Sequence, residues 1–130
     1  ATVHLNRTPE IMKGSRLCIA VSGTATLETA WHRTPMVVVY RTGAWAKPLA
    51  RRMLHVKNIC LVNILAGREI VPEHLMFDDD ARPVGQSALR LLQDPSAWEE
   101  CRRALDSVIL SLGPSGSSAR AARAVLEMVR

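Results

Sequence analysis

Residues 17–28 have the sequence LCIAVSGTATLE, in which an unbroken apolar run leads through a serine and a glycine into a helical pattern. An apolar run of this length with β-branched members is typical of a strand that is covered on both faces. We therefore expect a buried strand over residues 17–21, a turn at Ser22-Gly23, and a helix that continues to about residue 32.

The same succession of apolar runs and helical patterns continues along the chain. Residues 36–40 (MVVVY) and 59–62 (ICLV) repeat the pattern of a buried strand, and residues 2–5 (TVHL) form a shorter strand-like run. A helix is expected over about residues 45–56, between the two later strands. Because strands alternate with helices, the pattern predicts an α/β protein with a parallel sheet.

The remaining patterns are helical. We expect helices over about residues 83–93, 96–112 and 117–129, and a short helix with Thr8 as its N-cap, Pro9 at its first position and Gly14 at its end. One buried face of the long helix is formed by residues with three-or-four spacing, namely Trp98, Cys101, Leu105, Val108 and Leu112. The expected fold is a Rossmann-like parallel sheet of about four strands with flanking helices and a helical C-terminal section.

Length and composition indicate one domain over residues 1–130, because 130 residues with 48% apolar and 22% charged side chains suit a single globular unit. The apolar runs are much shorter than the ~18 residues of a membrane-spanning helix, and no signal-peptide pattern opens the chain. The chain starts on alanine directly before a strand-like run, so we expect a piece of a longer protein. Three widely spaced cysteines in apolar sequence indicate reduced, buried thiols and a cytoplasmic location.

The net charge of +5 is unevenly distributed. Residues 1–68 hold ten Lys and Arg against two acids, whereas residues 69–130 hold seven against ten. We therefore expect the first half to meet an anion. With one Phe, one Tyr and three Trp the chain has little surface on which bases could stack, so no nucleic-acid partner is expected.

The turn after the first buried strand is the most informative candidate site. A strand that opens a helix through Ser-Gly-Thr aims unpaired backbone N–H groups past its carboxyl end, which suits a phosphate or diphosphate. Gly23 permits close approach of the backbone, and the hydroxyls of Thr24 and Thr26 can add donors. Glu28 could accept hydrogen bonds from sugar hydroxyls, so the arrangement suits a nucleotide. The alternative is an ordinary capped helix with Glu28 as a helix acid.

A second cluster follows the expected strand over residues 59–62. Asn63, Arg68 and Glu69, with Glu73 further on, are expected at the same sheet edge as Ser22. There they could bind sugar hydroxyls and neutralise a phosphate, with Arg68 offering a bidentate guanidinium. The alternative is a surface loop with salt bridges in which Asn63 caps a turn.

The expected helix over residues 45–57 is basic and amphipathic. At 100° per residue its apolar stripe is formed by Trp45, Leu49, Met53 and Val56. The opposite side is basic and carries Lys47, Arg51 and His55. Such a helix either covers the sheet with its charges in water or lies on an anionic membrane surface. No metal is expected, because the four histidines have no paired spacing and Asp78-Asp79-Asp80 suits a solvated loop or a helix cap.

Four segments in the same order resemble the C-terminal part of the lipid-A-disaccharide synthase family. They are VSGTATLE at residues 21–28, TPMVVVYR at 34–41, NILAGRE at 63–69 and VPE at 71–73. The chain departs from the family pattern at Arg16, where an acid is usual, and at Val62, where a proline commonly precedes the asparagine.

The resemblance implies an inverting glycosyltransferase of the GT-B type, with two Rossmann-like domains that face a cleft. Such an enzyme transfers 2,3-diacylglucosamine from its UDP conjugate to 2,3-diacylglucosamine 1-phosphate and releases UDP without a metal or other cofactor. The C-terminal domain binds the UDP donor. The resemblance also implies contact with the cytoplasmic face of the inner membrane.

The family's site residues carry over to matching positions of this sequence. The resemblance makes the Ser22-to-Thr26 turn the diphosphate site, with Gly23, Thr24 and Ala25 as its backbone, and Glu28 the acid that binds ribose. It makes Asn63, Arg68 and Glu69 donor-site residues.

The resemblance implies that the acceptor site and the general base belong to an N-terminal domain that we expect to be missing from this chain, so we expect no catalytic residue and no turnover in the chain alone. The closing helix, residues 117–130, is expected to pack on that missing domain or on a partner chain, and its exposed apolar face could drive self-association.

Two other functions remain open at this point. The chain could be a non-catalytic basic α/β module that binds phosphate-rich partners such as nucleic acid or anionic lipid. It could also be a folded remnant that binds nothing.

Overall fold

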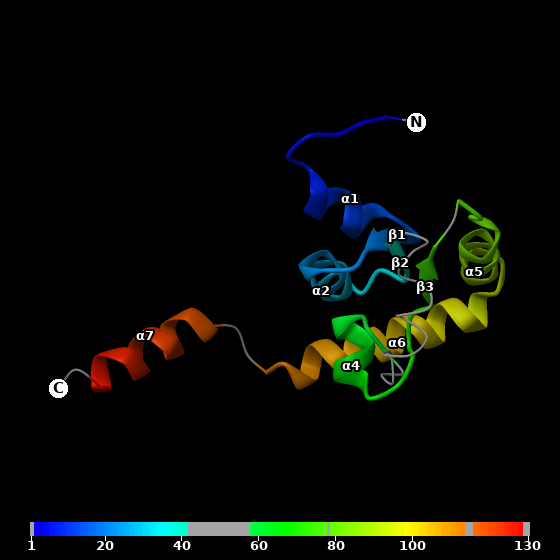
Figure 1. Ribbon diagram of the computed structural model, residues 1–130. Helices are drawn as coiled ribbons and strands as arrows, with labels where there is room; N and C mark the ends of the chain where they lie inside the picture. The colour runs from blue at the N-terminus through cyan, green and yellow to red at the C-terminus, as the bar shows by residue number, and fades with distance from the viewer. Residues whose placement is uncertain (1, 42–57, 78, 114–115, 129–130) are drawn as a thin grey trace.

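The computed structural model describes residues 2–41, 58–77, 79–113 and 116–128 (Figure 1). Within them the chain forms a small parallel sheet with helices packed around it and a helical C-terminal section. The α/β class expected from the alternation of apolar runs and helices is confirmed.

The sheet has the strand order β1-β2-β3. Its strands are β1 (Cys18–Val21), β2 (Met36–Arg41) and β3 (Glu73–Met76). β1 and β2 pair in parallel with Val21 opposite Val39, and β2 and β3 pair in parallel with Val38 opposite Glu73. Because all three strands are parallel, their carboxyl ends lie at one edge of the sheet and their amino ends at the other.

Six helices accompany the sheet in the described part of the chain. They are α1 (Thr8–Gly14), α2 (Thr24–Trp31), α4 (Leu61–Ala66), α5 (Arg82–Gln93), α6 (Pro95–Ser111) and α7 (Ser117–Met128). The long helix α6 contacts α2, α4 and α5 and so joins the elements that come before and after β3. Figure 1 shows α6 passing along the body of the protein, whereas α7 extends away from it.

The core is built from β2 and the faces of the helices that pack on it. Met36, Val37 and Val38 have no exposed surface, and Leu105 of α6 is equally buried. The expected face of α6 is largely confirmed, because Cys101, Leu105 and Val108 are buried, although Leu112 lies beyond the helix and is 45% exposed. Trp98 packs between the guanidinium groups of Arg16 and Arg102, each 5.3 Å from its ring centre.

Two of the expected strands are wrong. Residues 59–62 do not form a strand, because Cys60 is the N-cap of α4 and the helix starts at Leu61. A short apolar run cannot distinguish a buried strand from a buried helix by its pattern alone. Residues 2–5 form no strand either, and Val3 and Leu5 are exposed. The expected helix over residues 45–56 lies outside the described residues.

The third strand was not expected at all. β3 has the sequence EHLM, and all four of its side chains are half-buried. The sequence EHLM has neither an unbroken apolar run nor a strict alternation of apolar and polar residues, which are the patterns that reveal a strand.

The start of α1 also differs from the prediction. Arg7, and not Thr8, is the N-cap, and no side chain caps the helix. Gly14 is the last helical residue, as expected. The buried hydroxyl of Thr34, just before β2, donates to the Met12 carbonyl at 2.7 Å and ties α1 to the amino edge of the sheet.

The helix α7 carries its apolar side chains on the surface. Val125, Leu126 and Met128 are 59%, 67% and 86% exposed. Across the described residues, none of the helices combines the length and the apolar character that a bilayer crossing requires.

Truncation of a fully buried side chain of α6 should lower the stability of the folded chain. We expect Leu105→Ala to lower the free energy of unfolding by about 2–5 kcal/mol, because it leaves a cavity at a fully buried position. Leu110→Ala is the matched control, since Leu110 of the same helix is 69% exposed and its truncation should cost less than about 0.5 kcal/mol. Urea unfolding of both variants measures the difference, and equal losses would contradict the assignment of the core.

Candidate functional site

The turn between β1 and α2 has the backbone that an anion site requires. Gly23 is the N-cap of α2 with φ 151° and ψ −161°, a region that is open almost only to glycine. A Cβ atom at this position would meet no atom within 4 Å, so the requirement for glycine is one of conformation and not of space. The turn follows the carboxyl end of β1, as the sequence predicted.

The amides of Thr24 and Ala25 lie in the uncapped first turn of α2, whereas the Thr26 amide donates to the Gly23 carbonyl at 3.2 Å. No side chain caps this helix, and amides in a first helical turn have no carbonyl partner within the helix. Thr24 is exposed and Ala25 is half-buried. The hydroxyl of Thr26 is not available as an added donor, because Thr26 is fully buried and donates to the Gly23 carbonyl at 2.7 Å.

Glu28 lies one helical turn beyond Thr24 on the same face of α2, and both residues are exposed. Four residues correspond to a rise of about 6 Å along the helix axis. Glu28 therefore lies about one helical turn from the start of α2. No hydrogen bond or ion pair engages it among the described residues, which leaves it accessible to a ligand.

Asn63 lies in the interior and not at a sheet edge. It is fully buried in α4, where its Oδ1 accepts from the amides of Ile70 and Val71 at 2.7 and 3.0 Å. Its Nδ2 donates to the Val71 carbonyl at 2.8 Å and to the Glu73 carboxylate at 2.6 Å. These four bonds use the whole hydrogen-bonding capacity of an asparagine amide, so the part that Asn63 can play at a site is to hold the loop after α4.

The carboxylate of Glu73 joins α4 to β2. Besides Asn63, it accepts from the amides of Ile59 and Cys60 at the start of α4, at 3.0 and 2.9 Å. It also accepts from the Tyr40 hydroxyl at 3.1 Å. An acid at this end of a helix is favoured by the helix dipole.

Tyr40 brings β2 into this network, because its hydroxyl donates to Glu73. Burial raises the pKa of Tyr40 to about 12, and the nearby Glu73 charge adds to that rise. The phenol therefore stays protonated and donates to Glu73. Tyr40 thus connects β2 to the network around Asn63.

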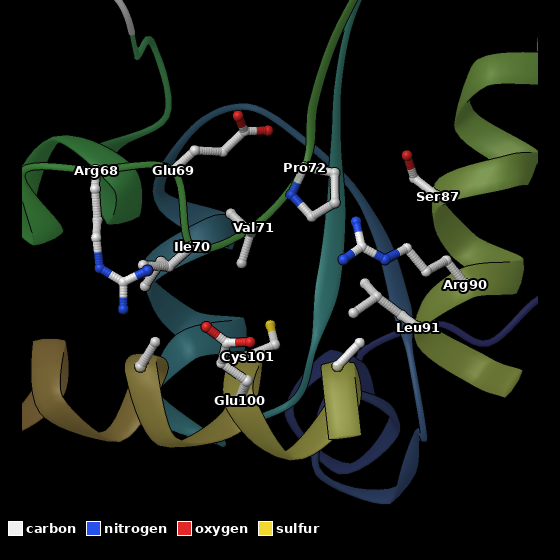
Figure 2. Close-up of a pocket in the computed structure, with 12 residues that line it drawn as sticks. Arg68, Glu69, Ile70, Val71, Pro72, Ser87, Arg90, Leu91, Glu100 and Cys101 are labelled. Carbon is white, nitrogen blue, oxygen red and sulfur yellow. The ribbon is translucent and has the colours of Figure 1, made fainter. Parts of the chain in front are cut away.

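Arg68 and Glu69 line a pocket of about 310 Å³ at the amino end of β3. Its other walls come from the residues just before β3 and from α5 and α6, and burial raises the pKa of the Cys101 thiol in its wall to about 11. Figure 2 shows Arg68 on one side, Arg90 of α5 on the other, and Glu100 of α6 between them.

The second predicted cluster is therefore divided. The expectation that it follows a strand is wrong, because Asn63 lies in a helix and Arg68 and Glu69 lie in the loop before β3. Glu73 hydrogen-bonds to Asn63 and to Tyr40 of β2. Sequence reasoning gave Tyr40 no role, since a contact between residues 33 positions apart leaves no spacing signal.

Within the described residues, no group of three or more His, Cys, Asp or Glu side chains is arranged to hold a metal ion. The polar groups at the turn after β1 are backbone amides, hydroxyls and one carboxylate, which suit a phosphorylated sugar better than a cation.

The single tyrosine offers a direct test of the network. Because its folded pKa of about 12 lies above the ordinary value near 10, the link from Tyr40 contributes stability that is complete below about pH 10 and is lost as the pH rises through 12. We expect the titration midpoint of Tyr40 in the native chain to lie about two pH units above that in the unfolded chain. Tyrosinate absorbance in the near ultraviolet measures both midpoints. Coincident midpoints in native buffer and in urea would show that the hydroxyl is not held as described.

Comparison with known proteins gives a consistent result. The family described as lipid-A-disaccharide synthetase matches residues 2–128. Lipid-A-disaccharide synthase of Geobacter sulfurreducens is 37% identical over 128 residues, which is 98% of this chain and 33% of the relative. The enzymes of Anaeromyxobacter dehalogenans and Gluconobacter oxydans are 40% and 38% identical over 95% and 85% of the chain, and over 32% and 27% of their own lengths.

No solved structure matches the chain. The chain spans about a third of the length of the curated relatives it matches. The match extends over nearly all of its residues, including the turn after β1, the loop before β3 and the closing helices. The chain belongs to the lipid-A-disaccharide synthetase family.

Proposed function

We propose that this chain is the UDP-sugar donor-binding part of a lipid-A-disaccharide synthase. The observation that carries the proposal is the uncapped amino end of α2 behind Gly23, with the exposed Glu28 carboxylate one turn further on. Backbone amides and the helix dipole suit the diphosphate, and a free carboxylate suits the two hydroxyls of a ribose.

The reaction would be hexosyl transfer from UDP-2,3-diacylglucosamine to 2,3-diacylglucosamine 1-phosphate. The bond between the anomeric carbon and the diphosphate oxygen breaks, and negative charge develops on the departing UDP. The amides of Gly23, Thr24 and Ala25 would stabilise this charge if the diphosphate binds at the uncapped start of α2. The acceptor site and the general base are assigned to residues outside this chain, so we expect no turnover from the chain by itself.

Arg68 and Glu69 enter this proposal on family resemblance alone. They line a pocket with α5 and α6, at the opposite edge of the sheet from the turn after β1. A donor that contacts both groups would have to extend from one edge towards the other. The titration below reports on them separately.

The donor-binding proposal is tested by titration of the isotope-labelled chain with UDP. We expect amide shifts centred on residues 23–28, and about tenfold weaker binding in Glu28→Ala, because a charged hydrogen-bond acceptor is lost. Glu10→Ala, an exposed acid of α1, is the matched control and should bind as the unchanged chain does.

The proposal fails if UDP shifts no amide of the turn, or if ATP produces the same shifts. Binding that ignores Glu28 and weakens steeply with salt would favour the basic phosphate-binding module instead. Shifts at Arg68 and Glu69 would add these residues to the donor site, and their absence would remove them from it.

We further propose a cytoplasmic protein that meets the inner membrane surface, where acylated substrates reside. The excess of Lys and Arg over residues 1–68 would favour contact with anionic headgroups. We also propose that the apolar face of α7 is covered in the assembled protein, either by the remaining polypeptide or by a second copy.

For the chain alone, the exposed side chains of α7 predict self-association. The mass measured by light scattering should rise with concentration, and Leu126→Lys should restore the monomer, because Leu126 is 67% exposed on that helix. Leu110→Lys, at a similarly exposed position of α6, should leave the association unchanged. A monomeric mass at all concentrations would contradict association through α7.

A further inference from the structure

The pocket at the amino end of β3 is surrounded by charged side chains of both signs. Two guanidinium groups, of Arg68 and Arg90, and two carboxylates, of Glu69 and Glu100, line its volume of about 310 Å³. Figure 2 shows the guanidinium groups on opposite sides of the pocket, with Glu100 between them. In the part of the chain that the structure describes, none of these four side chains makes a hydrogen bond or an ion pair. Their charged groups are therefore available to a ligand.

The floor of the pocket is apolar. Val71 just before β3, Leu91 of α5 and Cys101 of α6 line the pocket and are buried. Sites for small molecules typically combine an apolar lining with a few placed polar groups, in volumes from about 300 Å³ upwards. The pocket has this composition and lies at the small end of that range.

The walls of the pocket are held by hydrogen bonds. The loop before β3 is fixed by Asn63, whose Oδ1 accepts from the amides of Ile70 and Val71 at 2.7 and 3.0 Å. The helix α5 is tied to β3 by the hydrogen bond of 2.8 Å between Ser87 Oγ and His74 Nε2. A ligand would therefore enter a preformed pocket and would not have to order its walls.

The mixture of charges decides the class of ligand. A plain anion between the two guanidinium groups would also meet the carboxylate of Glu100, and a plain cation would meet the guanidinium groups. A molecule that carries both signs avoids this conflict. Its carboxylate accepts two parallel hydrogen bonds from a guanidinium group, and its ammonium group donates to a carboxylate. An apolar side chain on the same molecule would cover the buried floor.

We propose that this pocket binds a small zwitterion with an apolar body, of the class of the aliphatic α-amino acids. Arg90 binds the carboxylate of the ligand, Glu100 binds its ammonium group, and Arg68 closes the opposite side. Because α5 and α6 pack against each other, Arg90 and Glu100 are held at a set separation. The pocket is separate from the turn between β1 and α2, since that turn follows the carboxyl end of the parallel strand β1.

The test is a titration of the isotope-labelled chain with L-leucine, beside three analogues. Isocaproate lacks the ammonium group of leucine, isoamylamine lacks its carboxylate, and glycine lacks its apolar body. We expect leucine to shift the amides of residues 68–71, 88–91 and 97–104, with a dissociation constant on the order of 1 mM. Each analogue should bind about tenfold more weakly, because it lacks one of the three matched groups.

Two substitutions assign the groups of the ligand to the pocket. Glu100→Gln should weaken leucine about tenfold and should not weaken isocaproate, which has no ammonium group. Arg90→Gln should weaken leucine and isocaproate alike, since both carry the carboxylate. Glu99→Gln is the matched control, because Glu99 is the neighbouring exposed acid of α6 and does not line this pocket. All three positions are exposed, so the substitutions should leave the fold intact.

The absence of leucine shifts at the pocket would overturn the proposal, as would equal affinities for leucine and isocaproate. Equal losses in Glu100→Gln and Glu99→Gln would overturn it too. If UDP shifts the amides of the pocket and competes with leucine, the pocket belongs to the donor and the proposal is wrong. If UDP does not bind at residues 23–28, the proposed donor site fails, and the leucine titration still decides what this pocket binds.

Discussion

The carboxylate of Glu73 is the group on which the described arrangement depends. A half-buried carboxylate is stabilised when its oxygens are hydrogen-bonded, and Glu73 is bonded to two backbone amides, an asparagine and a tyrosine. These partners come from the start of α4, from its interior and from β2. Removal of the carboxylate would leave a helix end, an amide and a phenol without their partner. One side chain therefore links β3 to the start and interior of α4 and to β2.

The parallel topology separates two regions that the sequence alone would place together. The turn after β1 follows a carboxyl end, where the uncapped amides of α2 lie. The pocket lined by Arg68 and Glu69 lies before the amino end of β3, between α5 and α6. Its guanidinium groups and carboxylates balance in charge, in contrast to the turn, which offers donors from the backbone. The two regions thus differ in chemistry as well as in position.

Local signals were sufficient for much of the fold and for the position of the turn between β1 and α2. β1 and β2 follow from unbroken apolar runs, α2 follows from the glycine turn after β1, and the face of α6 follows from its spacing. β3 was missed because its sequence EHLM is half polar, and residues 59–62 were assigned to a strand because a short apolar run fits either element. The candidate turn at Ser22–Glu28 was found because its parts are contiguous. The role of Asn63 was not found, since its partners are fixed by tertiary contacts to the loop before β3.

The hydrogen bonds to Glu73 close loops of very different length. Asn63 and Glu73 are ten residues apart, whereas Tyr40 and Glu73 are 33 apart. By the logarithmic dependence of loop closure on length, the longer loop costs about 1 kcal/mol more conformational entropy. The hydrogen bond between Asn63 and Glu73 therefore costs less conformational entropy to form than the bond between Tyr40 and Glu73. We expect the local contact between α4 and β3 to form first and the longer-range contact to form later. On this account β2 gains its side-chain link to Glu73 late in folding, when α4 and β3 are already in place.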